Sequence, residues 1–299
     1  MGGGICGRSA EISGIGMRVL VTGATGFVGQ HLIPQLLESG HEVTAVARDK
    51  VKARSFDWYK RVLFMAQDIH HDIADPFEFF GRPDAIVHLA WGGLPNYKAL
   101  FHFEETLPRD YRFLKTLVEG GARHLLVTGT CLEYGIQNGC LSEEMASRPV
   151  TSYALAKDTL CKSLEMLIQD KGLAFQWARL FYMYGPGQNS NSLLSQLDRA
   201  LGNGDATFNM SGGDQLRDYL PAIAVAAQLV KLLAHPECSG IVNVCSGAPV
   251  SVRSVVERQL TERQTKIQLN LGHYPYPEYE PMAFWGNPRK FLSFIGNNR

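Results

Sequence analysis

The chain has 299 residues, which is long enough for one large domain or two of medium size with a well-buried core. Apolar residues make up 45%, charged residues 19%, and the formal net charge is zero. This composition is typical of a globular protein and argues against a nucleic-acid partner or an acidic disordered tail. No apolar run reaches membrane-spanning length, so we expect no contact with a membrane.

The six cysteines are scattered along the chain, without a C-x-x-C pair or a nearby histidine cluster. This pattern favours a reducing compartment and argues against a zinc site or a disulfide framework, so no metal is predicted. Residues 1–16 lack the basic start and apolar core of a signal peptide, and Met17 opens the first strand-like run. We therefore expect a cytoplasmic protein with a flexible leader over residues 1–16.

Short β-branched runs alternate with longer amphipathic runs between residues 17 and 185. A helix is expected over 27–40, ending at Gly40. Strands are expected over 17–23, 41–48, 85–90, 124–130 and 174–185. Continuous apolar strands separated by helices predict an α/β fold, a doubly wound parallel sheet covered by helices on both faces.

The composition changes after Gly185, where glycine, proline, asparagine and tyrosine become frequent. We expect residues 186–299 to form a smaller C-terminal lobe that mainly binds the substrate. The run 240–247 has the pattern of another strand, so some segments of this part are expected to return to the sheet.

The stretch "VLVTGATGFVGQHL" places Gly23, Gly26 and Gly29 between the first strand and the first helix. Glycine permits positive φ and lets a pyrophosphate approach the backbone, while the helix N-terminus offers free N–H groups and a positive dipole end. Three glycines alone also suit a plain tight turn. The strand before them and the helix after them favour a dinucleotide site.

The second strand ends in "VARDK", with Ala47 and Arg48 where an NAD site usually carries an acidic residue for the ribose 2′-hydroxyl. An arginine suits a 2′-phosphate by its charge and its forked donors, so NADP is favoured over NAD. The alternative is that Arg48 is a solvated surface charge and Asp49 contacts the ribose.

Two stretches, "YRFLK" (111–115) and "YALAK" (153–157), place a tyrosine and a lysine four positions apart. On a helix, either pair shares one face. A nearby ammonium favours the phenolate and lowers the pKa of the tyrosine. Spacing alone does not decide which pair transfers protons.

The spacing T-G-x-x-G-x-x-G, together with "YALAK", resembles the extended short-chain dehydrogenase/reductase family from Met17 to about Gly296. The resemblance implies a Rossmann-like fold, a nucleotide-sugar substrate, and a catalytic tyrosine that follows a hydroxyl residue at the end of the fifth strand. "LLVTGTCLEYG" fits that strand end. Thr130, Tyr153 and Lys157 are then the catalytic residues, and Tyr111 with Lys115 is expected to be a helix-surface pair.

The resemblance assigns roles to these residues. Tyr153 would donate a proton to the substrate oxygen, Lys157 would lower the pKa of Tyr153 and hold the nicotinamide ribose, and Thr130 would donate a hydrogen bond to the developing alkoxide. The implied cofactor contacts are Gly23, Thr25, Gly26, Phe27, Val28, Gly29, Arg48, Asp68, Ile69, Leu89, Ala90, Tyr153 and Lys157.

The residues after Thr130 discriminate among the reactions of the family. Its 4,6-dehydratases carry Thr-Asp-Glu there, whereas this chain has Cys131 and Leu132 after Thr130. GDP-fucose synthase has its cysteine at the position of Leu132, so Cys131 is expected to be a packed residue. Dehydration is therefore not expected. Ketone reduction and 4-epimerisation through a transient ketone remain, and Arg48 favours reduction with exchangeable NADPH.

The segment "QLRDYLP" resembles the family's diphosphate-binding segment, with Arg217 as the arginine. The family has asparagine where this chain has Tyr182, and "EETLPRDY" lacks another asparagine of the family, so this chain departs from the family at two positions near the expected substrate. The expected substrate contacts are Thr130, Tyr182, Asn189, Asn191, Ser192, Asn209 and Arg217.

Four stretches, "HLAWGGLPNY", "TGTCLEYG", "QWARLFYMYGPGQN" and "FNMSGGDQLRDYLP", resemble the branch of the family that reduces dTDP-4-keto-L-rhamnose for a bacterial surface polysaccharide. The expected protein is thus an NADPH-dependent 4-ketoreductase of a nucleotide-linked 6-deoxysugar, acting as a homodimer. The alternatives are a nucleotide-sugar 4-epimerase and a non-catalytic dinucleotide-binding regulator.

Overall fold

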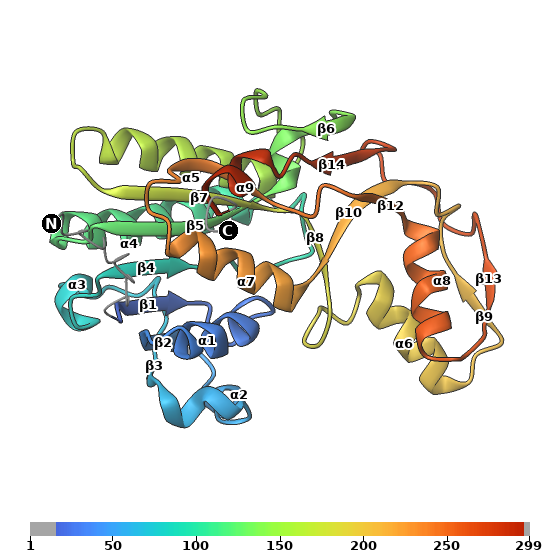
Figure 1. Ribbon diagram of the computed structural model, residues 1–299, viewed down its shortest axis with the longest axis horizontal. Helices are drawn as coiled ribbons and strands as arrows, with labels where there is room; N and C mark the ends of the chain where they lie inside the picture. The colour runs from blue at the N-terminus through green and yellow to red at the C-terminus, as the bar shows by residue number, and fades with distance from the viewer. Residues whose placement is uncertain (1–15, 296–299) are drawn as a thin grey trace, which may run out of the picture.

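The computed structural model describes residues 16–295, which form a sheet-based body and a smaller lobe beside it (Figure 1). The predicted leader lies outside these residues except for Gly16. Seven parallel strands form the central sheet in the order β11-β7-β5-β4-β1-β2-β3. Their bounds are β1 Arg18–Thr22, β2 Glu42–Ala47, β3 Leu63–Ala66, β4 Ala85–His88, β5 His124–Thr130, β7 Ala174–Leu180 and β11 Gly240–Val244.

The Rossmann-like parallel sheet is confirmed, with two differences from the expected strands. The short strand β3 was not predicted, because its four apolar residues show no alternation with polar ones, and none of them is fully buried. The single strand expected over 174–185 is divided at Phe181 into β7 and β8 (Tyr182–Tyr184), and β8 belongs to a different sheet.

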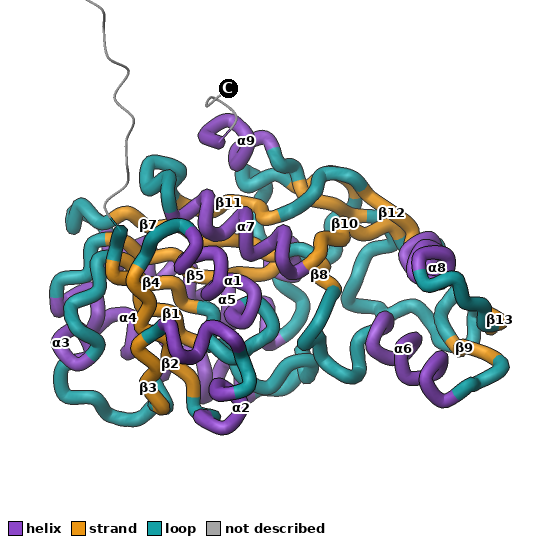
Figure 2. The backbone as a smooth tube through the Cα atoms, turned by 60° about the horizontal axis from the view of Figure 1, so that its bottom comes forward, coloured by secondary structure: helices purple, strands orange, loops and turns teal. Residues whose placement is uncertain are grey.

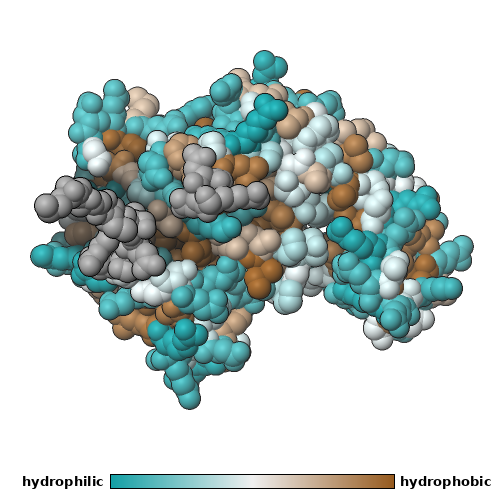
Figure 3. All heavy atoms as spheres, viewed as in Figure 1, coloured by the Kyte–Doolittle hydropathy of each residue, from teal (hydrophilic) through white to brown (hydrophobic). Residues whose placement is uncertain are grey.

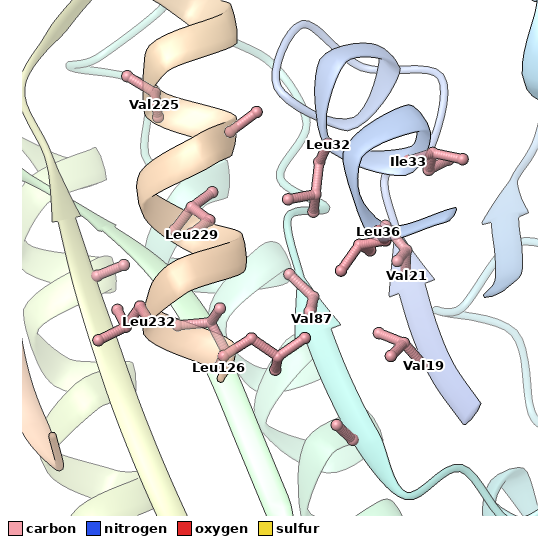
Figure 4. Packing of buried hydrophobic residues seen from close by; sticks show 14 of the residues in the cluster. Val19, Val21, Leu32, Ile33, Leu36, Val87, Leu126, Val225, Leu229 and Leu232 are labelled. Carbon is pink, nitrogen blue, oxygen red and sulfur yellow. The ribbon is translucent and has the colours of Figure 1, made fainter. Parts of the chain in front are cut away.

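Helices cover both faces of the central sheet (Figure 2). On one face, α1 (Gly29–Glu38) and α7 (Ala222–Leu233) pack on Val19, Val21 and Val87. Figure 4 shows Leu32 and Leu36 of α1 and Leu229 and Leu232 of α7, which belong to this apolar layer. Each fully buried leucine contributes roughly 1.5–3 kcal/mol relative to exposure to water.

On the opposite face, α4 (Leu107–Gly120) and α5 (Ser152–Ile168) pack on alternate residues of the same strands, such as Leu20 and Ile86. Because strand side chains alternate between the two faces, β1 contributes to both cores. The remaining elements of the body are α2 Lys50–Arg54, η1 Asp57–Arg61, α3 Pro76–Phe79, η2 His102–Thr106, η3 Cys131–Tyr134, β6 Gly139–Leu141, β14 Phe284–Gly286 and α9 Arg289–Ile295.

The smaller lobe has its own apolar core, in which Leu197, Phe208 and Val256 are buried. A three-stranded sheet, β12-β10-β8, joins the lobe to the body, and Figure 3 shows a notch in the surface between the two. The elements are α6 Leu193–Asn203, β9 Thr207–Asn209, β10 Leu216–Pro221, β12 Pro249–Ser251, α8 Val252–Glu262 and β13 Gln268–Asn270. Within residues 16–295, no helix combines the length and apolar character needed to cross a membrane.

Candidate active site

The turn between β1 and α1 lies at the carboxyl edge of the sheet, beside the end of β4. This is where the strand order reverses and where ligands bind in open α/β sheets. Gly23 has φ +69°, and a Cβ there would lie 2.8 Å from the Ala90 nitrogen. A Cβ on Gly29 would lie 2.5 Å from the Gly23 oxygen, so side chains at these positions would force the turn open.

The N-terminus of α1 suits an anionic ligand. Its N-cap residue is Val28, its first turn has no acidic residue, and no side chain of the described part of the chain caps it. The positive end of the helix is therefore not compensated by the protein, which fits the pyrophosphate of a dinucleotide.

The predicted cofactor contacts lie along one edge of the sheet. Thr25, Gly26 and Phe27 belong to the β1–α1 turn, Leu89 and Ala90 follow β4, Asp68 and Ile69 follow β3, and Arg48 follows β2. Arg48 is exposed. The Asp49 carboxylate accepts a hydrogen bond of 2.9 Å from the Lys52 N–H and caps α2. One of its oxygens is thus committed to the helix.

The structure brings the three predicted catalytic residues together. Thr130 ends β5, and Tyr153 and Lys157 lie in the first two turns of α5, which is capped by the Thr151 side chain. Burial raises the pKa of Tyr153, the Glu133 charge raises it further, and a hydrogen bond with the Thr130 side chain acts in the opposite direction. The Lys157 ammonium donates to the Thr128 oxygen of β5, so the start of α5 and the end of β5 lie side by side.

The expected effect of Lys157 on the pKa of Tyr153 stays a prediction. Burial is the largest influence on Tyr153 and raises its pKa. The Lys157 ammonium donates to the Thr128 oxygen at 2.8 Å and lies 4.1 Å from the centroid of the Trp91 ring. Burial lowers the pKa of Lys157 to about 8, against the charges of Asp110 and Glu133.

The segment between β4 and α4 covers Tyr153 with aromatic rings that the sequence did not assign to the site. The ring centroids of Trp91, Tyr97 and His102 lie 5.8, 5.7 and 5.3 Å from that of Tyr153. Residues 95–99 and Tyr279 line an open groove of about 480 Å³ beside these rings. The only sequence signal for this cover was the aromatic character of "HLAWGGLPNY", which does not reveal its position.

The second tyrosine–lysine pair is on α4, as expected of a helix-surface pair. The Lys115 side chain is 44% exposed, and its ammonium lies 3.7 Å from the Glu119 carboxylate on the same helix. The Tyr111 ring packs at the edge of the apolar core beneath α4.

Arg217 is buried rather than open to solvent. Its guanidinium donates to Glu280 at 2.8 Å and to the Leu216 and Met282 backbone oxygens at 2.9 and 3.3 Å. It also lies 5.7 Å from the centroid of the Tyr182 ring. Most of its donors are thus occupied within the protein, and its contact with a diphosphate stays a prediction.

The other predicted substrate contacts take part in local structure. Asn189 accepts from the Asn191 N–H at 2.8 Å, Ser192 caps α6, and Asn209 accepts from Asn270 at 2.7 Å. The loop that carries Asn189, Asn191 and Ser192 is hydrogen-bonded to α1, because the Gln30 side chain donates to the Pro186 oxygen at 2.9 Å. Their contact with substrate also stays a prediction.

The fold and this site define an NAD(P)-dependent oxidoreductase of the extended short-chain dehydrogenase/reductase class. The profile of the NAD dependent epimerase/dehydratase family matches residues 19–245, and the chain belongs to this family.

Two relatives from Aggregatibacter actinomycetemcomitans are similar over nearly the whole chain. One is dTDP-6-deoxy-L-talose 4-dehydrogenase (NAD(+)), 28% identical over 276 residues that cover 90% of this chain and 99% of the relative. The other is GDP-6-deoxy-D-talose 4-dehydrogenase, 25% identical over 94% of this chain and 92% of the relative. Among solved structures, MoeE5 in complex with UDP-glucose and NAD has a TM-score of 0.79 at 25% identity, covering 93% of this chain and 92% of its own.

Proposed function

We propose that the protein reduces the C4 ketone of a nucleotide-linked 6-deoxysugar, converting dTDP-4-keto-L-rhamnose to dTDP-6-deoxy-L-talose with NADPH. The observation that carries the proposal is the placement of Thr130 at the end of β5 beside the first two turns of α5, where Tyr153 and Lys157 lie and Lys157 donates to the Thr128 oxygen of β5 at 2.8 Å. The 28% identical relative is named for the same sugar and for redox chemistry at the same carbon.

The chemistry of the trio supports reduction. When bound, the nicotinamide supplies the hydride, and negative charge then builds on the carbonyl oxygen of the substrate. A tyrosine phenol is protonated near neutral pH, so Tyr153 can donate its proton to that oxygen. The Thr130 hydroxyl would donate a hydrogen bond to the same oxygen.

The residues after Thr130 support a reaction without a further acid or base. Leu132 cannot transfer protons, and Cys131 is 5% exposed, with burial raising the pKa of its thiol. Cys131 is therefore a neutral, packed thiol. Elimination of water needs proton-transferring groups at these positions, and this chain has none there.

The preference for NADPH rests on the end of β2. Arg48 is exposed there, and the Asp49 carboxylate caps α2, which supports the reading that Asp49 does not serve the ribose. The 28% identical relative is named as an NAD(+) enzyme, so NADH is the cofactor to compare.

The second candidate is a nucleotide-sugar 4-epimerase, because the family that matches includes epimerases. An epimerase would use Tyr153 first as a base and then as an acid, with no net change in the cofactor. The cytoplasmic location, the homodimer and the role in a surface polysaccharide stay predictions.

The test is to incubate the purified protein with dTDP-4-keto-L-rhamnose and either NADPH or NADH, follow the absorbance of the reduced nicotinamide, and identify the product sugar by NMR. Consumption of NADPH with formation of the 6-deoxy-talose derivative is expected. Epimerisation of dTDP- or UDP-linked sugars without added cofactor, and no consumption of NADPH with the keto-sugar, would overturn the proposal in favour of the epimerase.

A further inference from the structure

A carboxylate is buried directly beneath the catalytic residues. Glu133 follows Thr130 by three residues, in the single turn η3, and its side chain is fully shielded from solvent. One of its oxygens accepts the Thr130 backbone N–H at 2.8 Å. The Trp177 indole N–H donates to both oxygens, at 3.1 and 3.0 Å, and the Arg179 Nε donates to the second at 2.6 Å.

The residues around the Glu133 carboxylate donate hydrogen bonds to it or leave space for it. Trp177 and Arg179 lie on β7, next to β5 in the sheet, and the Arg179 guanidinium lies 4.4 Å from the centroid of the Tyr134 ring. A Cβ on Gly129 would collide with both the Trp177 indole nitrogen and a Glu133 oxygen. Glycine at 129 therefore belongs to the same arrangement.

Burying an ion pair in a protein core has a large desolvation cost. Removing a carboxylate and a guanidinium from water costs several kcal/mol each in general, and well-packed apolar side chains are often at least as stable in their place. Global stability is therefore a weak explanation for Glu133, and its hydrogen bond to a catalytic residue suggests a specific one.

We infer that Glu133 is a positioning residue that holds Thr130 in its reactive orientation through the Thr130 backbone N–H. This role rests on the proposed function of Thr130 and Tyr153. Thr130 and Glu133 form a capping box, in which the Thr130 hydroxyl oxygen accepts the Leu132 N–H at 3.3 Å. That contact occupies a lone pair of the hydroxyl and leaves its O–H free to donate to Tyr153 or to the substrate oxygen.

The charge of Glu133 gives this role a signature in the pH profile. Burial raises the pKa of Tyr153 and the Glu133 charge raises it further, while the same charge raises the pKa of Lys157 against the effect of burial. The polar and titratable groups around Tyr153 are Glu133 and Cys131 of η3, Thr130 of β5, Tyr97 and His102 of the β4–α4 segment, and Lys157 of α5. Reduction requires protonated Tyr153, so loss of the Glu133 charge should move the alkaline limb of the rate to lower pH.

The test is Glu133→Gln, assayed with NADPH and dTDP-4-keto-L-rhamnose. The amide nitrogen cannot accept from Arg179, so the side chain must reorient and release Thr130. We expect kcat to fall roughly ten- to a hundredfold, the KM values to change little, and the alkaline limb to move to lower pH. The double variant Glu133→Leu/Arg179→Met, which leaves neither an acceptor for the Thr130 N–H nor an unpaired guanidinium, should behave in the same way and covers the case in which the single variant fails to fold.

The matched control is Gln176→Leu at the other end of β7, where the side chain makes buried hydrogen bonds to Leu232 and His235 backbone oxygens. This variant should lose stability and keep the kcat and pH profile of the wild type per folded molecule. If the Glu133 variants match the control, or if the alkaline limb does not move, the role of Glu133 is refuted.

A second measurement needs no turnover. Hydrogen exchange of the Thr130 amide should be about tenfold faster in Glu133→Gln than in the wild type, because its acceptor is lost. Equal exchange rates overturn the inference even if the wild type reduces none of the keto-sugars. An inactive wild type with faster exchange in the variant would refute the proposed function and leave the anchoring of Thr130 standing.

Discussion

The Lys157 ammonium lies 4.1 Å from the centroid of the Trp91 ring. Its one hydrogen bond to a described residue is the 2.8 Å contact with the Thr128 oxygen. Lys157 is almost completely buried, so its ammonium group loses most of its hydration shell and contacts the face of Trp91 and one carbonyl oxygen instead. This environment explains why burial lowers the pKa of Lys157 to about 8.

The pKa of Lys157 predicts how stability depends on pH in the cofactor-free protein. The ordinary value is 10.5 and the folded value about 8, so the unfolded chain binds the proton more tightly over this interval. The free energy of unfolding should therefore rise as pH increases from about 8 to 10.5, by on the order of 3 kcal/mol from this group. Chemical denaturation of wild type and Lys157→Met at several pH values measures the contribution. A constant difference between the two proteins across this range would contradict it.

Tyr153→Phe should reduce kcat by orders of magnitude and leave cofactor affinity nearly unchanged, because the ring and its packing survive and only the proton donor is lost. The matched control is Tyr111→Phe, which removes the same hydroxyl from the pair on α4 and should be close to neutral. Steady-state kinetics and cofactor titration check both variants. Near-normal turnover in Tyr153→Phe would show that another group donates the proton.

Arg48→Ala should weaken NADPH binding by about 1–3 kcal/mol, as expected for a lost charge-assisted hydrogen bond, and hardly affect NADH binding. Titration calorimetry with the two cofactors measures the difference. Arg54, at the end of α2, provides a control substitution of a nearby basic residue. Equal effects on NADPH and NADH would mean that Arg48 does not contact the 2′-phosphate.

Arg217→Ala tests the diphosphate contact, but its ion pair with Glu280 requires a control. Both Arg217→Ala and Glu280→Gln remove the pair and should lower stability. If Arg217 binds the diphosphate, only Arg217→Ala should raise the KM for the dTDP-sugar. The increase should correspond to a loss of about 1.5–3 kcal/mol of binding free energy, and the affinity for NADPH should be unchanged in both variants. Identical KM changes in the two variants would assign Arg217 to structure alone.

The elements that the sequence predicted well are those with a strong local pattern. Alternating buried strands and helices follow from hydrophobic periodicity, and the tight turn between β1 and α1 follows from glycines placed between a strand and a helix. The four-residue spacing of Tyr153 and Lys157 is likewise a property of one helix. By contrast, β3 escaped prediction because a four-residue, partly exposed edge strand has almost no periodic signal.

By itself, then, the sequence determined the family and the order of most strands and helices along the chain, and it predicted the residues that carry the chemistry, because these depend on patterns within a few turns of chain. Only the tertiary structure decided which polar groups meet. Arg217 pairs with Glu280, 63 residues away, and Trp177 of β7 donates to Glu133, which lies just after the neighbouring strand β5. The Lys157 ammonium lies over the ring of Trp91 in a cation–π contact. Such contacts depend on strand order and on the burial of each partner, and local spacing along the chain contains neither.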